Sequence, residues 1–375
     1  MTLAVAKSEL PASGPQRLAA IAEKLAALGA RYDAVPMFPA DSVKLLVGAG
    51  LHKTFAPLAS GGDAFETPRA QNAALLDTLR VVGRADLSVG RIFEGHVNAL
   101  KLFDWYGTPA QKHRLARDLR DGKMFGVWAT EQPPGVTIQT NGAGWALSGK
   151  KSFATGAGSL DYAIITAKPE GAERRMVIAQ AGEARRADLS GWRVRGMRAT
   201  VSGSYDFSGL RLEQADLLGE PGQYDREPRF TAGAWRFTAV QLGGIEALLT
   251  ETRAAMSDAA RADVLHRAKF GAAVVATRTA YLWVREAAQR AADEDDNAIA
   301  FSQMTRGVVE RAALDVMELA ARIVGTRSAF EGQRIDKIIR DLSLYLRQAG
   351  PDYARDQAAQ AWLDHDAWGA GDALW

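Results

Sequence analysis

The residues able to do acid–base chemistry lie in two short stretches of this chain. RIFEGHVNAL, residues 91–100, places Glu94 and His96 on one predicted apolar helix. A histidine there could act as a general base or as a hydrogen-bond donor, because imidazole titrates near neutrality. The alternative is that both are ordinary polar residues of a helix near a subunit contact. In the second stretch, RDLSLYLRQAGPD (residues 340–352), the middle residues from Arg347 to Gly350 include no carboxylate that could accept a proton.

Several other kinds of chemistry are excluded by the residue types present. The chain of 375 residues has no cysteine, which excludes disulfides, thiolate nucleophiles and cysteine-ligated metal centres. Its five histidines do not have metal-ligand spacing, so we expect no metal site. The sequence has no phosphate-binding loop, dinucleotide motif or Gly-x-Ser-x-Gly elbow. The net charge of +2 comes from interspersed charges of both signs, which predicts neither a nucleic-acid surface nor a membrane surface.

The sequence also predicts no targeting or membrane segment. Its first residues, MTLAVAKSELPASGPQ, make a poor signal peptide because polar residues and prolines soon interrupt a short apolar run. No stretch approaches the roughly 20 apolar residues of a membrane span. We therefore expect a soluble, cytoplasmic protein.

Three regions of different periodicity must position the candidate residues. Residues 1–122 repeat Leu, Ala and Ile at three- and four-residue spacing, which predicts a helical domain. In its last helix, Thr108 is the expected N-cap and Pro109 the first helical residue. Residues 123–226 hold short β-forming runs divided by Gly, Asp and Ser, which predict a small β-barrel or sandwich. Residues 227–375 return to helical spacing and predict a bundle of long helices, so the fold class is α+β.

Five segments, in this order and spacing, resemble the acyl-CoA dehydrogenase superfamily. They are YGTPAQKHRLARDLRDGKMFGVWATEQP, WALSGKKSFATGAGSLDYAIITA, RGMRATVSGSYDFSGLRLEQADLLGEPGQ, HRAKFG, and the final helices from RIVG to IIRDLSLY. The resemblance implies an N-terminal helical domain, a central β-barrel and a C-terminal four-helix bundle. It also implies an FAD-dependent oxidoreductase that acts on an acyl-thioester-like substrate by hydride transfer to the flavin.

The resemblance further implies where the flavin ring binds. The ring-contacting segments of the family match Trp128, Ala129, Thr130, Phe153 and Thr155. An aromatic wall packs against an isoalloxazine ring, while hydroxyls and backbone amides meet its polar edge. The alternative is that Phe153 and Thr155 only fill a barrel strand.

The remaining cofactor contacts are implied in the helical bundle. Arg267, with Phe270 nearby, matches the segment that reaches the FAD pyrophosphate of a neighbouring subunit, since a guanidinium fork pairs with phosphate oxygens. Taken alone, Arg267 is equally consistent with a helix-surface arginine. Gly325 matches the turn beside the adenine half, although the family's second glycine is Thr326 here. Binding across subunits implies a homo-oligomer, either a dimer or a homotetramer.

Two departures from the family concern the substrate. Spacing from Arg340 puts Ala349 where the family has its catalytic glutamate. The earlier helix that carries the base in some members has Ala234 or Trp235 near that point. In addition, the Gly-Ser-Asp run that helps to bind CoA is shortened and replaced by residues 133–135, Pro-Pro-Gly, which puts CoA recognition in question.

Two alternatives stay open, because a missing base would slow α,β-dehydrogenation by about 10²–10⁴-fold. One is a flavin-dependent monooxygenase on the same fold, which uses reduced flavin from a separate reductase together with oxygen, and Glu94 or His96 in its pocket. The other is a non-catalytic homologue that works as a partner subunit. The expected partners are a small-molecule substrate such as an acyl-CoA, and either an electron-acceptor protein or a flavin reductase.

Overall fold

The computed structural model describes residues 14–141, 144–348 and 350–363, and this part of the chain begins with helices. They are α1 (Gly14–Ala19), α2 (Ala22–Ala34), α3 (Ala40–Gly48), α4 (Leu51–Thr54), α5 (Pro68–Ala85), α6 (Leu87–Tyr106) and α7 (Pro109–Arg120). The predicted start of α7 is confirmed. The Thr108 hydroxyl accepts a hydrogen bond from Gln111 N at 3.2 Å, and the Gln111 side chain accepts one from Thr108 N at 3.0 Å.

Strands occupy the middle of the chain. They are β1 (Phe125–Trp128), β2 (Thr137–Asn141), β3 (Gly144–Ser148), β4 (Lys150–Ala154), β5 (Tyr162–Pro169), β6 (Arg175–Gln180), β7 (Ala187–Asp188), β8 (Gly203–Asp206), β9 (Arg211–Leu212) and β10 (Leu217–Leu218). One sheet has the order β10-β6-β5-β2-β3-β9 with β1 beside β5, and a second sheet has the order β4-β8-β7. β1 runs parallel to β5, pairing Phe125 with Tyr162, whereas β5 and β6 are antiparallel. Alternating apolar side chains of both sheets fill a common core.

The last third of the described chain is helical again. Its helices are α8 (Arg229–Ala232), α9 (Trp235–Ala255), α10 (Asp258–Ala262), α11 (Val264–Ala292), α12 (Ala298–Val324), α13 (Arg334–Tyr345) and α14 (Pro351–Leu363). The order helical, stranded, helical therefore agrees with the order expected from the sequence. None of the described helices combines the length and the apolarity that crossing a bilayer would require.

Helix α5 of the N-terminal region packs as part of the helical bundle, directly against α9 and α11. Two glycines permit this close approach. A Cβ atom on Gly243 would lie 2.1 Å from Arg80 O, and one on Gly83 would lie 2.4 Å from Val240 O. Apolar residues of both regions consequently share one core, while the domain limits expected at residues 122 and 226 stay a prediction.

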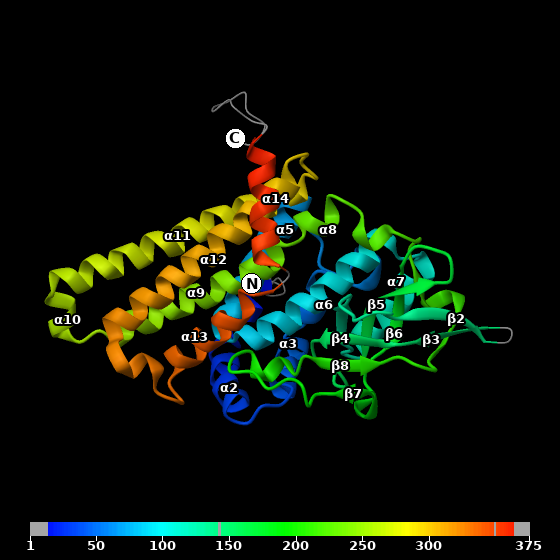
Figure 1. The fold of residues 1–375 in the computed structure, drawn as a ribbon, viewed down its shortest axis with the longest axis horizontal. Coiled ribbons are helices and arrows are strands. Elements are labelled where there is room, and N and C mark those ends of the chain that lie inside the picture. Colours follow the sequence, from blue (N-terminus) through cyan, green and yellow to red (C-terminus); the bar gives the residue numbers. More distant parts are fainter. Residues whose placement is uncertain (1–13, 142–143, 349, 364–375) are drawn as a thin grey trace, which may run out of the picture.

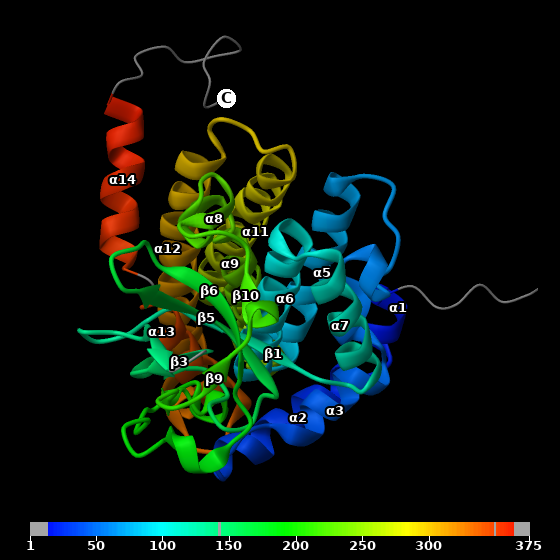
Figure 2. The same cartoon turned by 90° about the vertical axis from the view of Figure 1, so that its right-hand side faces the viewer.

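α6 is the element that joins the two halves of the molecule. It contacts β1 on one side and α5, α9 and α13 on the other. Figure 1 shows it between the helical bundle and the strands, and Figure 2 shows the same arrangement from the strand side. Its side chains are therefore buried over most of its length, and those that reach a cavity lie between bundle and sheets.

Candidate functional site

A cavity of about 790 Å³ lies where α6, the ends of β1 and β4, and helices α8, α9 and α13 meet. This volume is within the range of small-molecule sites, about 300–1,000 Å³. The strand-side wall includes the five residues that the sequence assigned to the flavin ring: Trp128, Ala129, Thr130, Phe153 and Thr155. The opposite, helical wall carries most of the charged groups.

Phe153 is the most unusual residue of the strand-side wall. It is 67% exposed although it is large and apolar, and its φ of 52° is left-handed. A left-handed conformation costs a non-glycine residue about 1–2 kcal/mol. The pairing of β4 with β8 is irregular between Lys151 and Ala154, and such bulges redirect side chains beside functional sites. The strained backbone thus presents the ring of Phe153 to the cavity rather than to the barrel core, which counts against a space-filling role.

Hydroxyl groups on the same wall form a directed chain. Thr200 Oγ1 donates to Met197 O at 2.8 Å, and Ser202 Oγ donates to Thr200 Oγ1 at 2.9 Å. The hydroxyl of Ser202 has only one hydrogen, so in its 3.0 Å contact with Thr155 the donor must be Thr155 Oγ1. Thr155 Oγ1 therefore keeps its lone pairs for a donor in the cavity, while the Thr155 carbonyl oxygen accepts a hydrogen bond from Trp128 Nε1 at 3.1 Å.

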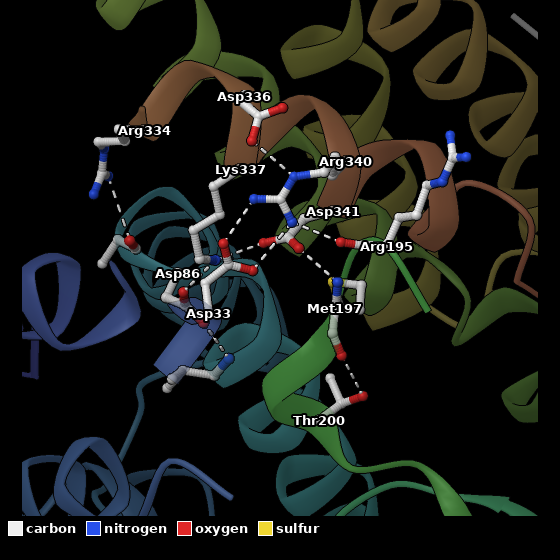
Figure 3. Close-up of polar contacts among 12 residues, drawn as sticks. Asp33, Asp86, Arg195, Met197, Thr200, Arg334, Asp336, Lys337, Arg340 and Asp341 are labelled. Carbon is white, nitrogen blue, oxygen red and sulfur yellow. Dashed lines mark hydrogen bonds and ion pairs between the residues drawn. The ribbon is translucent and has the colours of Figure 1, made fainter. Parts of the chain in front are cut away.

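The loop that carries Met197 is anchored to α13 (Figure 3). Asp341 accepts a hydrogen bond from Met197 N at 2.5 Å and an ion-pair contact from Lys337 Nζ at 2.6 Å. Lys337 Nζ also lies 2.7 Å from Asp86, whose second carboxylate oxygen caps α6 by accepting from Val89 N at 2.9 Å. Through these contacts α13 fixes an element on each wall of the cavity.

Arg340 provides a second anchor beside the first. Its guanidinium group pairs with Asp33 at 2.6 and 3.1 Å and with Asp336 at 2.8 Å, and it donates to Arg195 O at 2.6 Å. The chains come so close that a Cβ on Gly196 would lie 1.9 Å from Arg340 O. A second cavity, of about 700 Å³, borders this paired network. The Arg-Asp dipeptide of RDLSLY thus acts as a structural anchor.

The helical wall of the larger cavity contains a hydrogen-bonded row of charged and polar groups. Arg91 and Asn98 each donate to one carboxylate oxygen of Glu94, and Arg236 Nε donates to Asn98 Oδ1 at 2.6 Å. Arg91, Glu94 and Asn98 share one face of α6 because residues three and four apart lie above one another on a helix. Burial lowers the pKa of Arg236, and the negative charge of Glu94 and the nearby Tyr224 only partly offset this.

His96 lies elsewhere, although the sequence paired it with Glu94 as a catalytic candidate. It is fully buried, Phe125 N donates to its Nδ1 at 3.0 Å, and its Nε2 lies 2.6 Å from His52 O. Nε2 must therefore carry the hydrogen, and burial lowers the pKa of His96 to about 4. Residues two apart on a helix point in nearly opposite directions, and His96 is not among the residues that line the cavity. The structure thus separates it from Glu94 and gives it the role of fastening α6 to β1.

The other predicted residues lie away from the cavity. Arg267 is exposed near the start of α11, where its Nη1 donates to Arg261 O at 3.1 Å, and Phe270 follows on the same helix. Gly325, with a φ of 71°, ends α12. The roles assigned to Arg267 and Phe270 need a neighbouring subunit, and these roles and that of Gly325 stay predictions. Ala349, at the expected position of the catalytic base, lies outside the described residues.

Three functional candidates were not found from the sequence. Asn98 and Arg236 complete the row on the helical wall, and Tyr345 lines the same cavity from α13. Asn98 could have been found from the sequence, because Arg91, Glu94 and Asn98 are spaced three and four residues apart along an apolar helix. Arg236 directly follows the Ala-Trp pair that the sequence marked as the alternate base position.

The strand-side wall has the groups that a flavin ring requires. Phe153 offers an exposed aromatic face and Thr155 an unused lone pair, while Thr130 and the backbone of β1 can meet polar ring atoms. Among the described residues no cluster of side chains could hold a metal ion. The aromatic and hydroxyl groups of the strand-side wall fit an organic cofactor beside a charged wall.

Comparison with known proteins gives relatives that are named as monooxygenases. A dibenzothiophene monooxygenase from Mycolicibacterium goodii is 26% identical over 188 residues, 47% of this chain and 44% of that protein. The chain thus matches less than half of the length of this relative. A probable FMNH2-dependent monooxygenase, SfnC, from Pseudomonas putida is 26% identical over 337 residues, 81% of this chain and 83% of that protein. No family model matches the chain.

Among solved structures, TdsC from Paenibacillus sp. A11-2 with FMN and indole superposes with a TM-score of 0.83. It is 19% identical, with 94% of this chain and 97% of that chain covered. The two sequence relatives are monooxygenases, which favours the alternative left open above over dehydrogenation, and the flavin named for SfnC and TdsC is FMN rather than FAD. The expected fold is confirmed: this chain adopts the α+β fold of the acyl-CoA dehydrogenase superfamily.

Proposed function

We propose that this protein is a flavin-dependent monooxygenase that uses reduced FMN, supplied by a separate reductase, together with oxygen. The observation that carries the proposal is the hydrogen bonding of Glu94, a carboxylate that lines the cavity. Among the described residues that line the cavity, Glu94 is the one acidic side chain, and both of its oxygens already accept hydrogen bonds, from Arg91 and Asn98.

Dehydrogenation of a thioester needs a base beside the substrate carbon that loses its proton. A carboxylate whose two oxygens already accept hydrogen bonds from an arginine and an amide has no free oxygen directed at a substrate. At the position that the family resemblance assigns to the base, this chain has Ala349. These facts support a reaction in which the substrate accepts an oxygen atom rather than one in which it loses hydrogen.

We place the flavin ring against the strand-side wall, in contact with Phe153 and Thr155 and with residues 128–130. When bound, reduced flavin supplies the electrons that activate oxygen. Phe153 would cover one side of a bound ring and exclude water, and the Thr155 hydroxyl would be available to accept a hydrogen bond from it. Arg91 and Glu94 neutralise each other beside the substrate.

FMN replaces the FAD first expected, because the flavin named for SfnC and TdsC is FMN. We keep Arg267 and Phe270 as candidate contacts to the flavin phosphate of a neighbouring subunit. This arrangement requires a homo-oligomer.

The test measures flavin binding and reactivity together. Wild-type protein should bind reduced FMN, consume oxygen and oxygenate a probe such as dibenzothiophene or indole. Phe153→Ala should weaken FMN binding about tenfold by removing a stacking face. Phe330→Ala, which also removes an exposed phenylalanine but one that does not line the cavity, is the matched control. Bleaching of bound flavin by an acyl-CoA panel without oxygen would refute the proposal in favour of dehydrogenation.

A further inference from the structure

The charge on the helical wall of the cavity is unbalanced. The charged residues that line it are Arg91, Glu94, Arg229, Arg236, Arg306 and Arg347. Glu94 is committed to Arg91, and Arg229 pairs with Glu294, which is not part of the lining, at 2.9 Å. Arg236 is left without an ion pair in the described part of the chain.

Arg236 is held so that one edge of its guanidinium group is free. Its Nε donates to Asn98 Oδ1 at 2.6 Å, and the orientation of Asn98 is set because its Nδ2 donates to Glu94. The two terminal nitrogens remain, and they form the paired donors that bind a carboxylate or sulfonate in two parallel hydrogen bonds. Gly233 leaves space for them, since a Cβ there would lie 2.4 Å from Arg236 Nη2.

Tyr345 supplies a second, independent sign of a missing ligand. It lines the same cavity, is 3% exposed, and its hydroxyl has no hydrogen-bond partner within the described ranges. A buried hydroxyl without a partner is unfavourable, as is a half-buried charge without a counter-ion. Because both groups line the same cavity, one bound ligand with an anionic group for Arg236 and an acceptor atom for Tyr345 would satisfy both.

Apolar residues that line the cavity beside Arg236 indicate what kind of ligand body it accepts. Leu102, Trp105 and Phe237 contribute apolar and aromatic surface beside Arg236, and the Arg236 guanidinium lies 6.0 Å from the centre of the Trp105 ring. Such a lining accepts an apolar body, whereas Arg236 accepts one negative group.

We propose that the substrate is an apolar or aromatic molecule with one carboxylate or sulfonate group, which binds Arg236 and Tyr345. This inference rests on the proposed function, because it assigns the flavin to the strand-side wall and the substrate to the helical wall. Arg236 orients the substrate, and the row from Asn98 to Arg91 holds Arg236 in place.

The experiment compares an anion with its neutral counterpart. Naphthoate and naphthamide are titrated calorimetrically into wild-type protein, with and without FMN, so no turnover is needed. Naphthoate should bind about ten- to a hundredfold more tightly, the usual gain from charge-assisted hydrogen bonds. Arg236→Gln keeps an N–H donor near Asn98 but removes the charge, so the preference should vanish while naphthamide and FMN affinities stay unchanged.

Two further variants keep the test decisive. Arg236→Lys retains the charge without the planar fork and should keep part of the preference, even if Arg236→Gln does not fold. Arg322→Gln removes a surface arginine that is 60% exposed and pairs with Glu318, and it should change nothing.

Three results would overturn the inference: equal wild-type affinity for naphthoate and naphthamide, binding of neither probe, or an Arg236→Gln variant that loses its preference for FMN over riboflavin. The last would assign Arg236 to the flavin phosphate. Oxygen chemistry with reduced FMN but no anion preference would overturn this inference alone. Anion preference without oxygen chemistry would overturn the proposed function alone.

Discussion

Substitution of Lys337 tests most directly whether buried ion pairs anchor α13 to the walls of the cavity. Lys337→Met keeps the length of the side chain and removes its charge. Lys337 Nζ lies 2.7 Å from Asp86 and 2.6 Å from Asp341, whose side chains are 2% and 1% exposed. Without Lys337, two buried carboxylates would face each other with no counter-ion. Removing one partner of a buried ion pair costs about 3–5 kcal/mol of unfolding free energy, so we expect a loss of that size.

The loss should depend on pH in a defined direction. Burial raises the pKa of Asp341, the charge of Asp86 raises it further, and Lys337 opposes both. The variant therefore raises the pKa of Asp341 still more. A carboxyl group whose folded pKa exceeds its unfolded value binds more protons in the folded state, so stability falls as pH rises between the two values. The destabilisation by Lys337→Met should be larger at about pH 8 than at about pH 5.

Urea unfolding followed by tryptophan fluorescence at both pH values measures this difference. The double variant Lys337→Met with Asp341→Asn removes one of the facing charges and should recover part of the loss. Lys44→Met is the control, because Lys44 is 80% exposed and its pair with Asp41 at 3.9 Å contributes less than about 1 kcal/mol. A loss from Lys337→Met as small as that of the control, or one that is equal at both pH values, would refute the buried ion-pair reasoning.

The remaining predictions concern the two walls of the cavity. Phe153→Gly should raise the unfolding free energy by about 1 kcal/mol, because glycine adopts a left-handed conformation freely, yet weaken FMN binding in a fluorescence titration. Since the pKa of His96 is lowered from 6.5 to about 4, the unfolded state takes up a proton first, and wild-type stability should fall as pH decreases through that window. His96→Gln should flatten that fall in acid-unfolding curves, and an unchanged slope would contradict the assignment. Glu94→Gln removes the carboxylate that pairs with Arg91 and the negative charge near Arg236, and it should raise naphthoate affinity roughly tenfold in calorimetry; lower affinity would count against an anion site.

The sequence by itself determined the order of the regions and the fold. Helical spacing, short β-forming runs and the Thr108 cap are local properties, because each depends on residues a few positions apart. The family's ring-contacting segments were also local, and all five residues matched to them line one cavity. Helical spacing alone would also have placed Glu94 and His96 on different faces of their helix, since residues two positions apart are about 200° apart around the helix axis.

Only the tertiary structure decided which charges meet. Asn98 and Arg236 are 138 positions apart, and they touch because α6 and α9 pack in one core. The left-handed backbone conformation that exposes Phe153 depends on an irregular pairing between β4 and β8. No local sequence pattern predicts this pairing. Unpaired charge is a property of the whole neighbourhood rather than of one residue type, because any packed element can supply the counter-ion. For that reason the proposed anion-binding edge of Arg236 could be recognised only from the tertiary structure.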